Sequence, residues 1–360
     1  AEQARSVATA SELRERIRAR LAQLLAVYEH GPGEDALLNA LQARYPQAEH
    51  RRRLLLAVHG FDEAAIFTIH GFCQRALQDA AFEAGGDFDA ELTQDDRELL
   101  DALLADLWRQ HLADADADWA AFLVQHKITP QSLRQRLRGH LGKPYLRIEP
   151  TPGAGVELAP LRRAWNHAQA LWHSRAEDWL AQLRECDGFK SNMFDATKLA
   201  AWQASLDAYF SDPAALFAGG DALTRLSREG LAKACKKDRQ APPSPLGDAL
   251  QALCEALATA RPQAERRLID LQVELIAQLN LQLPQRKAAQ RLLAFDDLLN
   301  RLREGLYGEG GDSLAATLRA QYPVALIDEF QDTDPIQYDI FRRIYPADVA
   351  GADLCFVGDP

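Results

Sequence analysis

The chain has 360 residues, enough for about two domains of roughly 150 residues each. Hydrophobic residues make up 47% and charged residues 26%, as in globular proteins, and no stretch approaches the roughly 18 uninterrupted apolar residues that a membrane helix requires. The net charge of −11 argues against nonspecific affinity for nucleic acid, and the five cysteines lie far apart without metal-ligand spacing. We therefore expect a soluble, reduced, cytoplasmic protein without a membrane span, a visible targeting segment or structural zinc.

Hydrophobic periodicity predicts helix over most of the chain. Apolar residues at three- and four-residue steps indicate an amphipathic helix over 12–29, with Thr9 and Glu12 as a capping box and a Gly-Pro-Gly sequence at its end. The run AAIFTI at 64–69 predicts a strand. Further helices are expected at 35–45, 47–59, 72–82, 94–113, 130–140, 156–186, 196–210 and 246–305, the last interrupted by Pro262 and Pro284.

Charge is unevenly distributed along the middle of the chain. Residues 81–128 are rich in Asp and Glu, which makes that segment unsuited to DNA. The next stretch, up to residue 147, contains Arg134, Arg136 and Arg138 and no acid, and a second basic stretch lies at 233–239. Any nucleic acid bound here should contact these two stretches, although a solvated helix face is the somewhat better interpretation of each stretch taken alone.

Three of the six tryptophans repeat every seven residues, at Trp165, Trp172 and Trp179. This spacing places them on one face of a helix, and a helix face of this kind usually packs in a core or an interface. We therefore predict a packing role for them and do not expect them to stack on DNA bases.

Two strand patterns stand near the end of the chain, VALIDEF at 324–330 and DLCFV at 353–357, with a helical segment between them. Continuous apolar runs of this length predict a parallel βαβ unit covered on both faces. Ligands of open parallel sheets bind beyond the carboxyl ends of the strands, where Asp328 and Glu329 stand. An apolar strand ending in Asp-Glu suits a Walker B site, and by pattern alone a solvated loop is an equally good interpretation. Asp334 before Pro335 predicts a helix N-cap.

Several segments carry a resemblance to known helicases. LIDEFQDTDPIQYDIF resembles motif II of superfamily 1A helicases, the group of UvrD, Rep and PcrA, and FVGDP resembles the start of their next motif. Thr68 and His70 in AAIFTIHGFCQRAL are similar to the TxH segment of that group. DEAAIFTIHGFCQR, ATASELRERIR and LAFDDLLNRL are closer to the RecB family, the helicase-nuclease subunits of bacterial exodeoxyribonuclease V complexes.

This resemblance implies a mainly α fold, in which a large helical insertion domain (1B) is attached to a partial RecA-like α/β P-loop domain (1A). Residues 1–84 would form 1A segments and entry helices with the TxH motif, 85–290 the 1B domain, and 291–360 the 1A segment with Walker B and the start of motif III. The parent would be an ATP-dependent 3′–5′ DNA helicase and exonuclease subunit that acts on double-strand ends in recombinational repair. Its nuclease residues would lie outside this chain. Its partners would be DNA, as duplex ends and single-stranded tails, and RecC-like and RecD-like subunits.

The resemblance also implies roles for single residues. Asp328 would hold Mg²⁺, Glu329 would be the general base for ATP hydrolysis, and Gln331 would couple the nucleotide site to the DNA side. Thr68 and His70 would contact the DNA backbone. Arg134, Arg136 and Arg138 of the first basic stretch are candidates for further DNA contacts because of their charge and not because of the resemblance. Phe72 is expected in the core. Asp296 and Asp297, adjacent on a helix and about 100° apart, are interpreted as positioning residues between subdomains rather than as metal ligands.

One required element is missing from the printed sequence, because no GxxxxGK[ST] loop is present to cradle the ATP phosphates. We therefore expect ATP and Mg²⁺ to bind in the complete protein but not well to this chain, which alone should be inactive as an ATPase. Two alternatives remain open: a fragment of an AddA-like or UvrD-like helicase, and a non-catalytic helical interaction module.

Overall fold

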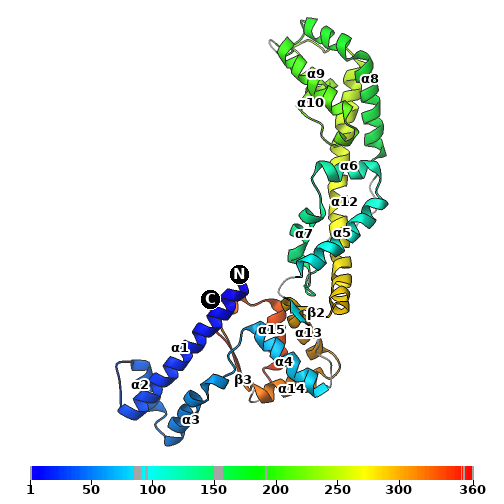
Figure 1. Ribbon diagram of the computed structural model, residues 1–360. Helices are drawn as coiled ribbons and strands as arrows, with labels where there is room; N and C mark the ends of the chain where they lie inside the picture. The colour runs from blue at the N-terminus through cyan, green and yellow to red at the C-terminus, as the bar shows by residue number, and fades with distance from the viewer. Residues whose placement is uncertain are drawn as a thin grey trace. The chain divides into compact units, whose positions relative to one another are not determined.

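The structure is a computed structural model that describes residues 2–84, 91–93, 96–149, 157–190, 193–349, 351 and 353–358 (Figure 1). It divides into two compact units, one formed by Ala1–Gln94 with Arg291–Pro360 and the other by Asp95–Gln290. Helices dominate both units, as the sequence predicted, and the strands form two small parallel pairs among the described residues. None of the described helices combines the length and the apolar character that a membrane crossing requires.

The first unit contains helices from both ends of the chain and four short strands. Its helices are α1 (Glu2–His30), α2 (Ala36–Arg44), α3 (Ala48–His59), α4 (Ile69–Ala84), α13 (Phe295–Tyr307), α14 (Gly311–Gln321) and α15 (Pro335–Ile344), with 3₁₀ turns η1 (Phe61–Glu63) and η4 (Phe330–Asp332). Its strands are β1 (Glu91–Thr93), β2 (Leu292–Ala294), β3 (Val324–Ile327) and β4 (Asp353–Phe356). Of the two strand pairs, β3–β4 was predicted; β1–β2 was not, and β2 lies where the sequence predicted helix over 246–305.

Two predictions for the N-terminal segment are wrong. Helix α1 begins at Glu2, so Thr9 lies inside the helix and does not cap it. The segment 64–68 is not a strand, and α4 begins directly after it at Ile69. Within this segment the Ile66 amide donates to the Ala64 carbonyl at 2.8 Å, and Arg14 of α1 donates to the carbonyl oxygens of Ala64 at 3.1 Å and Ile66 at 3.5 Å. These carbonyls are satisfied by a guanidinium instead of a neighbouring strand.

The C-terminal strands form the predicted parallel βαβ unit. β3 pairs with β4 from Val324 opposite Asp353 to Ile327 opposite Phe356, and α15 connects them. The expected cover on both faces is not found among the described residues, because Leu326 is 72% exposed while its neighbour Ile327 is 8% exposed. The strand therefore alternates between a buried and an exposed face.

The core of the first unit lies between α4, α13, α14 and α15. Phe72 is buried there as predicted, and its ring stacks on that of Phe341 with centroids 5.5 Å apart. Cys73 is fully buried beside it, and burial raises the pKa of its thiol to about 12. This cysteine is therefore a packing residue and not a nucleophile.

The second unit is helical throughout its described part. Its helices are α5 (Arg97–Ala113), α6 (Ala117–Gln125), α7 (Pro130–Leu137), α8 (Ala159–Glu185), α9 (Ala196–Ser211), α10 (Asp221–Leu226), α11 (Arg228–Ala234) and α12 (Pro245–Ala289), with 3₁₀ turns η2 (Arg138–His140) and η3 (Pro213–Ala215).

Helix α12 is the long axis of this unit. Its 45 residues span about 68 Å at 1.5 Å per residue. The predicted interruptions at Pro262 and Pro284 are wrong, because both prolines lie inside the continuous helix. An interior proline costs about 3 kcal/mol, and the packing of α12 against α8 and α5 outweighs this cost. The helix ends instead before Arg291, which adopts the left-handed conformation with φ 54°.

Helix α8 runs beside α12 (Figure 1). Trp165, Trp172 and Trp179 are all buried, which confirms the packing role that their spacing predicted. The indole of Trp172 donates to Asp207 on α9 at 2.7 Å, so its polar atom is satisfied inside the core.

Candidate functional site

The carboxylate pair lies where the β3–β4 pair ends. Asp328 and Glu329 follow β3 directly, and both are exposed. The amide of Val357 donates to the Ile327 carbonyl at 2.8 Å, and the amide of Phe330 donates back to the Val357 carbonyl at 3.0 Å. The turn that carries the two carboxylates is thus tied by backbone hydrogen bonds to the end of β4.

Glu329 has an unusual backbone conformation, with φ 52° and ψ 46°. This left-handed conformation costs a residue other than glycine about 1–3 kcal/mol, and such residues cluster at functional sites. The Asp328 Oδ1 atom accepts the Glu329 amide at 3.0 Å, which stabilises the turn from its N-terminal side. The Asp328 carboxylate therefore helps to stabilise the backbone conformation of Glu329.

Gln331 and Gly358 complete this site. The Gln331 Nε2 atom donates to Glu329 Oε2. A Cβ atom at position 358 would lie 2.4 Å from Gln331 Oε1 and 3.0 Å from the Phe330 amide nitrogen, so a larger residue there would displace the Gln331 side chain and press on the backbone of the turn. The sequence placed Gly358 at the end of a strand but carried no signal for this close approach, and Asp359 lies outside the described residues.

Asp328 fits the part of a magnesium ligand. Mg²⁺ keeps several of its waters and usually takes one or two carboxylates together with phosphate oxygens. A single exposed carboxylate beyond a parallel strand meets that requirement. Within the described part of the chain, no three His, Cys, Asp or Glu side chains come close enough to form an all-protein metal site. Asp328 and Glu329 thus suit an ion that arrives with its phosphate ligand.

The remaining acids of the C-terminal segments have local roles. Asp334 accepts the Ile336 amide at 2.8 Å and caps α15, with Pro335 in the first turn, which confirms the predicted N-cap. Asp297 accepts the Ala294 amide at 2.8 Å and thereby stabilises the start of α13. The side chain of Asp296 lies outside the described residues.

Thr68 and His70 stand at the start of α4, and both side chains are half-buried. The Thr68 hydroxyl oxygen accepts the Gly71 amide at 3.1 Å and so caps the helix. A hydroxyl that accepts in this way still has its own proton to donate. Thr68 can therefore cap α4 and contact a phosphate oxygen at the same time.

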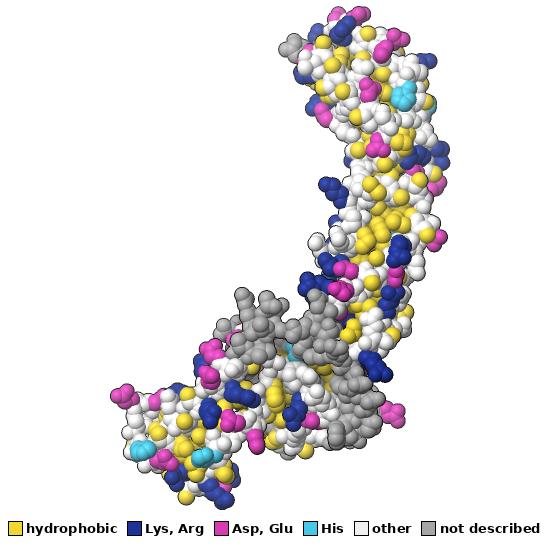
Figure 2. Space-filling view, in the orientation of Figure 1, with side chains coloured by type: hydrophobic (Ala, Val, Ile, Leu, Met, Phe, Trp, Pro, Cys, Tyr) yellow, Lys and Arg dark blue, Asp and Glu magenta, His cyan; other side chains and the backbone are white. Residues whose placement is uncertain are grey.

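The three arginines of the first basic stretch differ in environment. Arg134 on α7 makes an ion pair with Asp101 of α5, with Nη1 2.8 Å from Oδ2, and only 26% of its side chain is exposed. Arg136 and Arg138 are exposed. On the visible face of the second unit, Asp and Glu side chains stand among the Lys and Arg side chains (Figure 2).

The two basic stretches do not form one surface. The first stretch contacts the C-terminal part of α12, where the Gly142 amide donates to Asn280 at 3.0 Å. The second stretch begins in α11, whose Leu231 packs near Gly247 in the first turn of α12. Positions 247 and 280 are 33 residues apart on one helix, a distance of about 50 Å.

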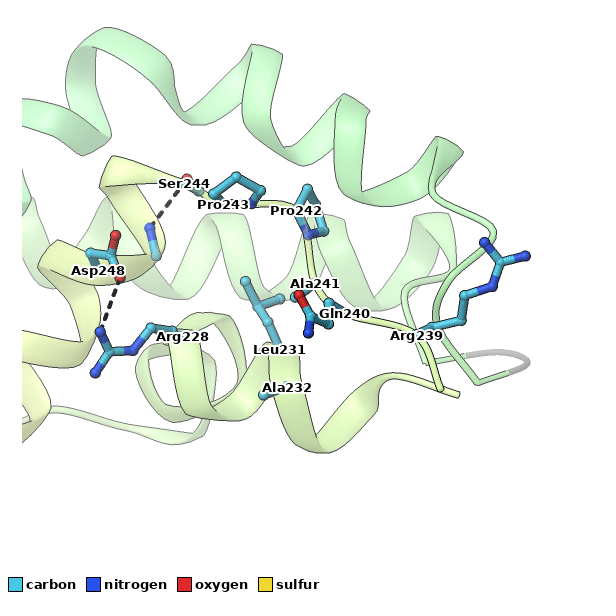
Figure 3. A pocket seen from close by; sticks show the side chains of 11 residues that line it. Arg228, Leu231, Ala232, Arg239, Gln240, Ala241, Pro242, Pro243, Ser244 and Asp248 are labelled. Atoms are coloured by element: carbon cyan, nitrogen blue, oxygen red, sulfur yellow. Dashed lines mark hydrogen bonds and ion pairs between the residues drawn. The ribbon is translucent and has the colours of Figure 1, made fainter. Parts of the chain in front are cut away.

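A pocket of about 350 Å³ lies beside the second stretch, between α11, the 239–244 loop and the start of α12 (Figure 3). Leu231, Pro242 and Pro243 form apolar walls, and Arg228 pairs with Asp248 at 3.5 Å. Arg239 of the second basic stretch lines this pocket, whereas none of the residues predicted for catalysis does.

Comparisons with known proteins agree with these features. The family model of the UvrD/REP helicase N-terminal domain matches residues 6–360. The RecB subunit of the RecBCD enzyme from Escherichia coli is 32% identical over 363 residues, which cover 98% of this chain and 30% of that protein. The RecB subunits from Haemophilus influenzae and Chlamydia trachomatis are 30% and 27% identical, over 91% and 98% of this chain and 29% and 34% of their own lengths. The chain thus spans about a third of the length of these curated relatives.

Proposed function

This chain belongs to the UvrD/REP helicase family and is RecB-like, and from this premise we propose that it is part of an ATP-driven DNA helicase that acts in the repair of double-strand ends. The observation that carries the proposal is the Asp328-Glu329 pair beyond the end of β3, tied to the end of β4. The first unit would belong to a RecA-like motor domain (1A) and the second unit would be its helical insertion (1B).

At the nucleotide site the two carboxylates would have different roles, one in metal binding and one in base catalysis. Asp328 would hold Mg²⁺ through its water shell, and the ion would neutralise charge on the phosphate oxygens when ATP is bound. Glu329 would orient the attacking water and accept its proton. Gln331, which donates to Glu329, would link the position of this base to the DNA side. The loop that cradles the phosphates would come from outside the printed sequence.

On the DNA side, Thr68 and His70 would contact the phosphate backbone of the tracking single strand. Arg14 would support them indirectly, because it holds the segment that leads into Thr68. The exposed Arg136 and Arg138 would contact the duplex ahead. The whole protein would act in the cytoplasm with RecC-like and RecD-like partners and would also have a nuclease activity. In it, ATP hydrolysis would drive movement along the bound strand in the 3′ to 5′ direction.

The proposal is tested by strand separation with the natural full-length protein. We expect it to unwind a duplex with a 3′ single-stranded tail when ATP and Mg²⁺ are present, and not to unwind a duplex with a 5′ tail. The 5′-tailed substrate has the same duplex and serves as the matched control. Unwinding without ATP would refute the motor, and equal unwinding of both substrates would refute the polarity.

A second prediction concerns the exposed arginines. Replacing Arg136 and Arg138 by alanine should weaken binding of this chain to a tailed duplex and reduce the slope of log K against log salt by about 1.5–2, as for two lost phosphate contacts. Fluorescence anisotropy across a salt series measures this slope. Arg134 is kept, since its removal would leave Asp101 of the core helix α5 without its ion pair.

The matched control for these arginines is the double change Arg163→Ala and Arg175→Ala, which removes the same charge from exposed positions of α8. This control should leave the slope close to that of the unmodified chain. A slope that falls equally in both variants would show a general charge effect. An unchanged slope in the Arg136 and Arg138 variant would assign these two side chains to solvent.

A further inference from the structure

Three aromatic rings meet immediately behind the Glu329 turn. The Phe330 ring of η4 lies 4.2 Å from the Phe356 ring of β4, centroid to centroid, and 6.1 Å from the Tyr338 ring of α15. The Tyr338 and Phe356 rings are 5.9 Å apart. One ring each from the turn η4, helix α15 and strand β4 thus joins a single cluster, which we call the ring cluster.

Phe330 is the residue next to Glu329, and it connects the strained turn to β4 in two ways. Its amide donates to the Val357 carbonyl at 3.0 Å, and its ring rests on Phe356. Gly358 also lies close to this turn, since a Cβ atom built on it would be 3.0 Å from the Phe330 amide nitrogen. A change in the packing of this ring would therefore free the backbone of Glu329 to leave the left-handed conformation.

We propose that Phe330, Tyr338 and Phe356 are positioning residues that hold Glu329 in its left-handed conformation and so direct its carboxylate. This inference rests on the proposed ATPase function of Glu329. The three rings act through the backbone of Glu329 and have no contact with the reacting atoms. Tyr338 acts through its ring, because its part in the cluster is ring packing against Phe330 and Phe356.

The cluster lies at the edge of the core of the first unit. All three side chains are half-buried; Phe356 packs against that core, whereas Phe330 and Tyr338 lie outside the set of residues that pack it. A neighbour on the same face of β4, Leu354, is half-buried against that core. Truncation of Leu354 should therefore disturb β4 about as much as truncation in the ring cluster, without releasing Phe330.

The test uses DNA-stimulated ATP hydrolysis by the natural full-length protein. Tyr338→Ala and Phe356→Leu should each lower kcat roughly 10- to 100-fold, as a misplaced catalytic group does, while the KM for ATP stays within about twofold. Tyr338→Phe keeps the ring and should restore kcat to near the unmodified level. Leu354→Ala is the matched control and should lower the melting temperature without a comparable loss of kcat.

Glu329→Gln, measured in parallel, distinguishes a failure of the proposed ATPase function from a failure of the positioning role of the ring cluster. Full activity of Glu329→Gln would overturn the proposed function itself. If Glu329 is required but Tyr338→Ala and Phe356→Leu lose no more kcat than Leu354→Ala, the positioning role is refuted and the function stands. A loss in Tyr338→Phe equal to that in Tyr338→Ala would also refute it, because the hydroxyl and not the ring would then be the important group.

Discussion

Replacement of Glu329 by glutamine is expected to lower the kcat of ATP hydrolysis by the natural full-length protein about 10²- to 10⁴-fold, the usual contribution of a general base. Glutamine has nearly the shape of glutamate and can still accept the hydrogen bond from Gln331, but its amide cannot take a proton from water. Steady-state hydrolysis at saturating DNA measures kcat and KM separately. Binding of ATP should be preserved, since Asp328 remains to hold the metal.

Asp332→Asn is the matched control for this change. Asp332 is an exposed acid in the same turn, so its replacement removes the same charge three residues further along. We expect kcat near the unmodified value, because no catalytic role falls on Asp332. If Glu329→Gln retained activity while Asp332→Asn lost it, the base would have been assigned to the wrong carboxylate of the turn.

The second large effect concerns stability. Trp172→Ala should lower the free energy of unfolding of the second unit by about 3–5 kcal/mol, because the indole is 1% exposed and its removal leaves a cavity between α8 and α9. The change also leaves Asp207 without the donor that now satisfies it. Urea unfolding followed by circular dichroism measures the loss.

Trp202→Ala is the comparison for Trp172→Ala. Trp202 lies on α9 at the edge of the same core and is half-buried, so a smaller loss of unfolding free energy is expected. Trp172→Phe should fall between the two alanine variants, since it keeps most of the ring volume. Equal losses for Trp172→Ala and Trp202→Ala would contradict the burial difference on which this prediction depends.

Much of the local structure was predictable because its causes lie within a few residues. The Asp334-Pro335 pair specifies the start of α15, since the cap and the proline act on adjacent backbone groups. The seven-residue spacing of the tryptophans specifies the buried face of α8. Two short apolar runs around a helix of crossover length specify the parallel pairing of β3 and β4.

The predictions that failed concern features that depend on contacts between segments far apart in the sequence. The expected strand at 64–69 is replaced by a segment whose Ala64 carbonyl accepts from Arg14, fifty residues away in the sequence. Helix α12 continues through Pro262 because its whole length packs on other helices, which no local rule registers. Asp101 engages Arg134 from another helix and sets it apart from Arg136 and Arg138, although the three look alike in the sequence.

In the candidate site, too, some features follow from adjacent residues and others only from tertiary contacts. By itself, the sequence determined that Asp328 and Glu329 follow an apolar strand and that the chain resembles a helicase, because both depend on the order of adjacent residues. The tertiary structure alone decided that Glu329 is left-handed, that Gly358 lies close to Gln331 and Phe330, and that three rings gather behind the turn. These features arise where β4 and α15 meet the end of β3, and contacts between segments distant in sequence are selected by packing rather than by local propensity.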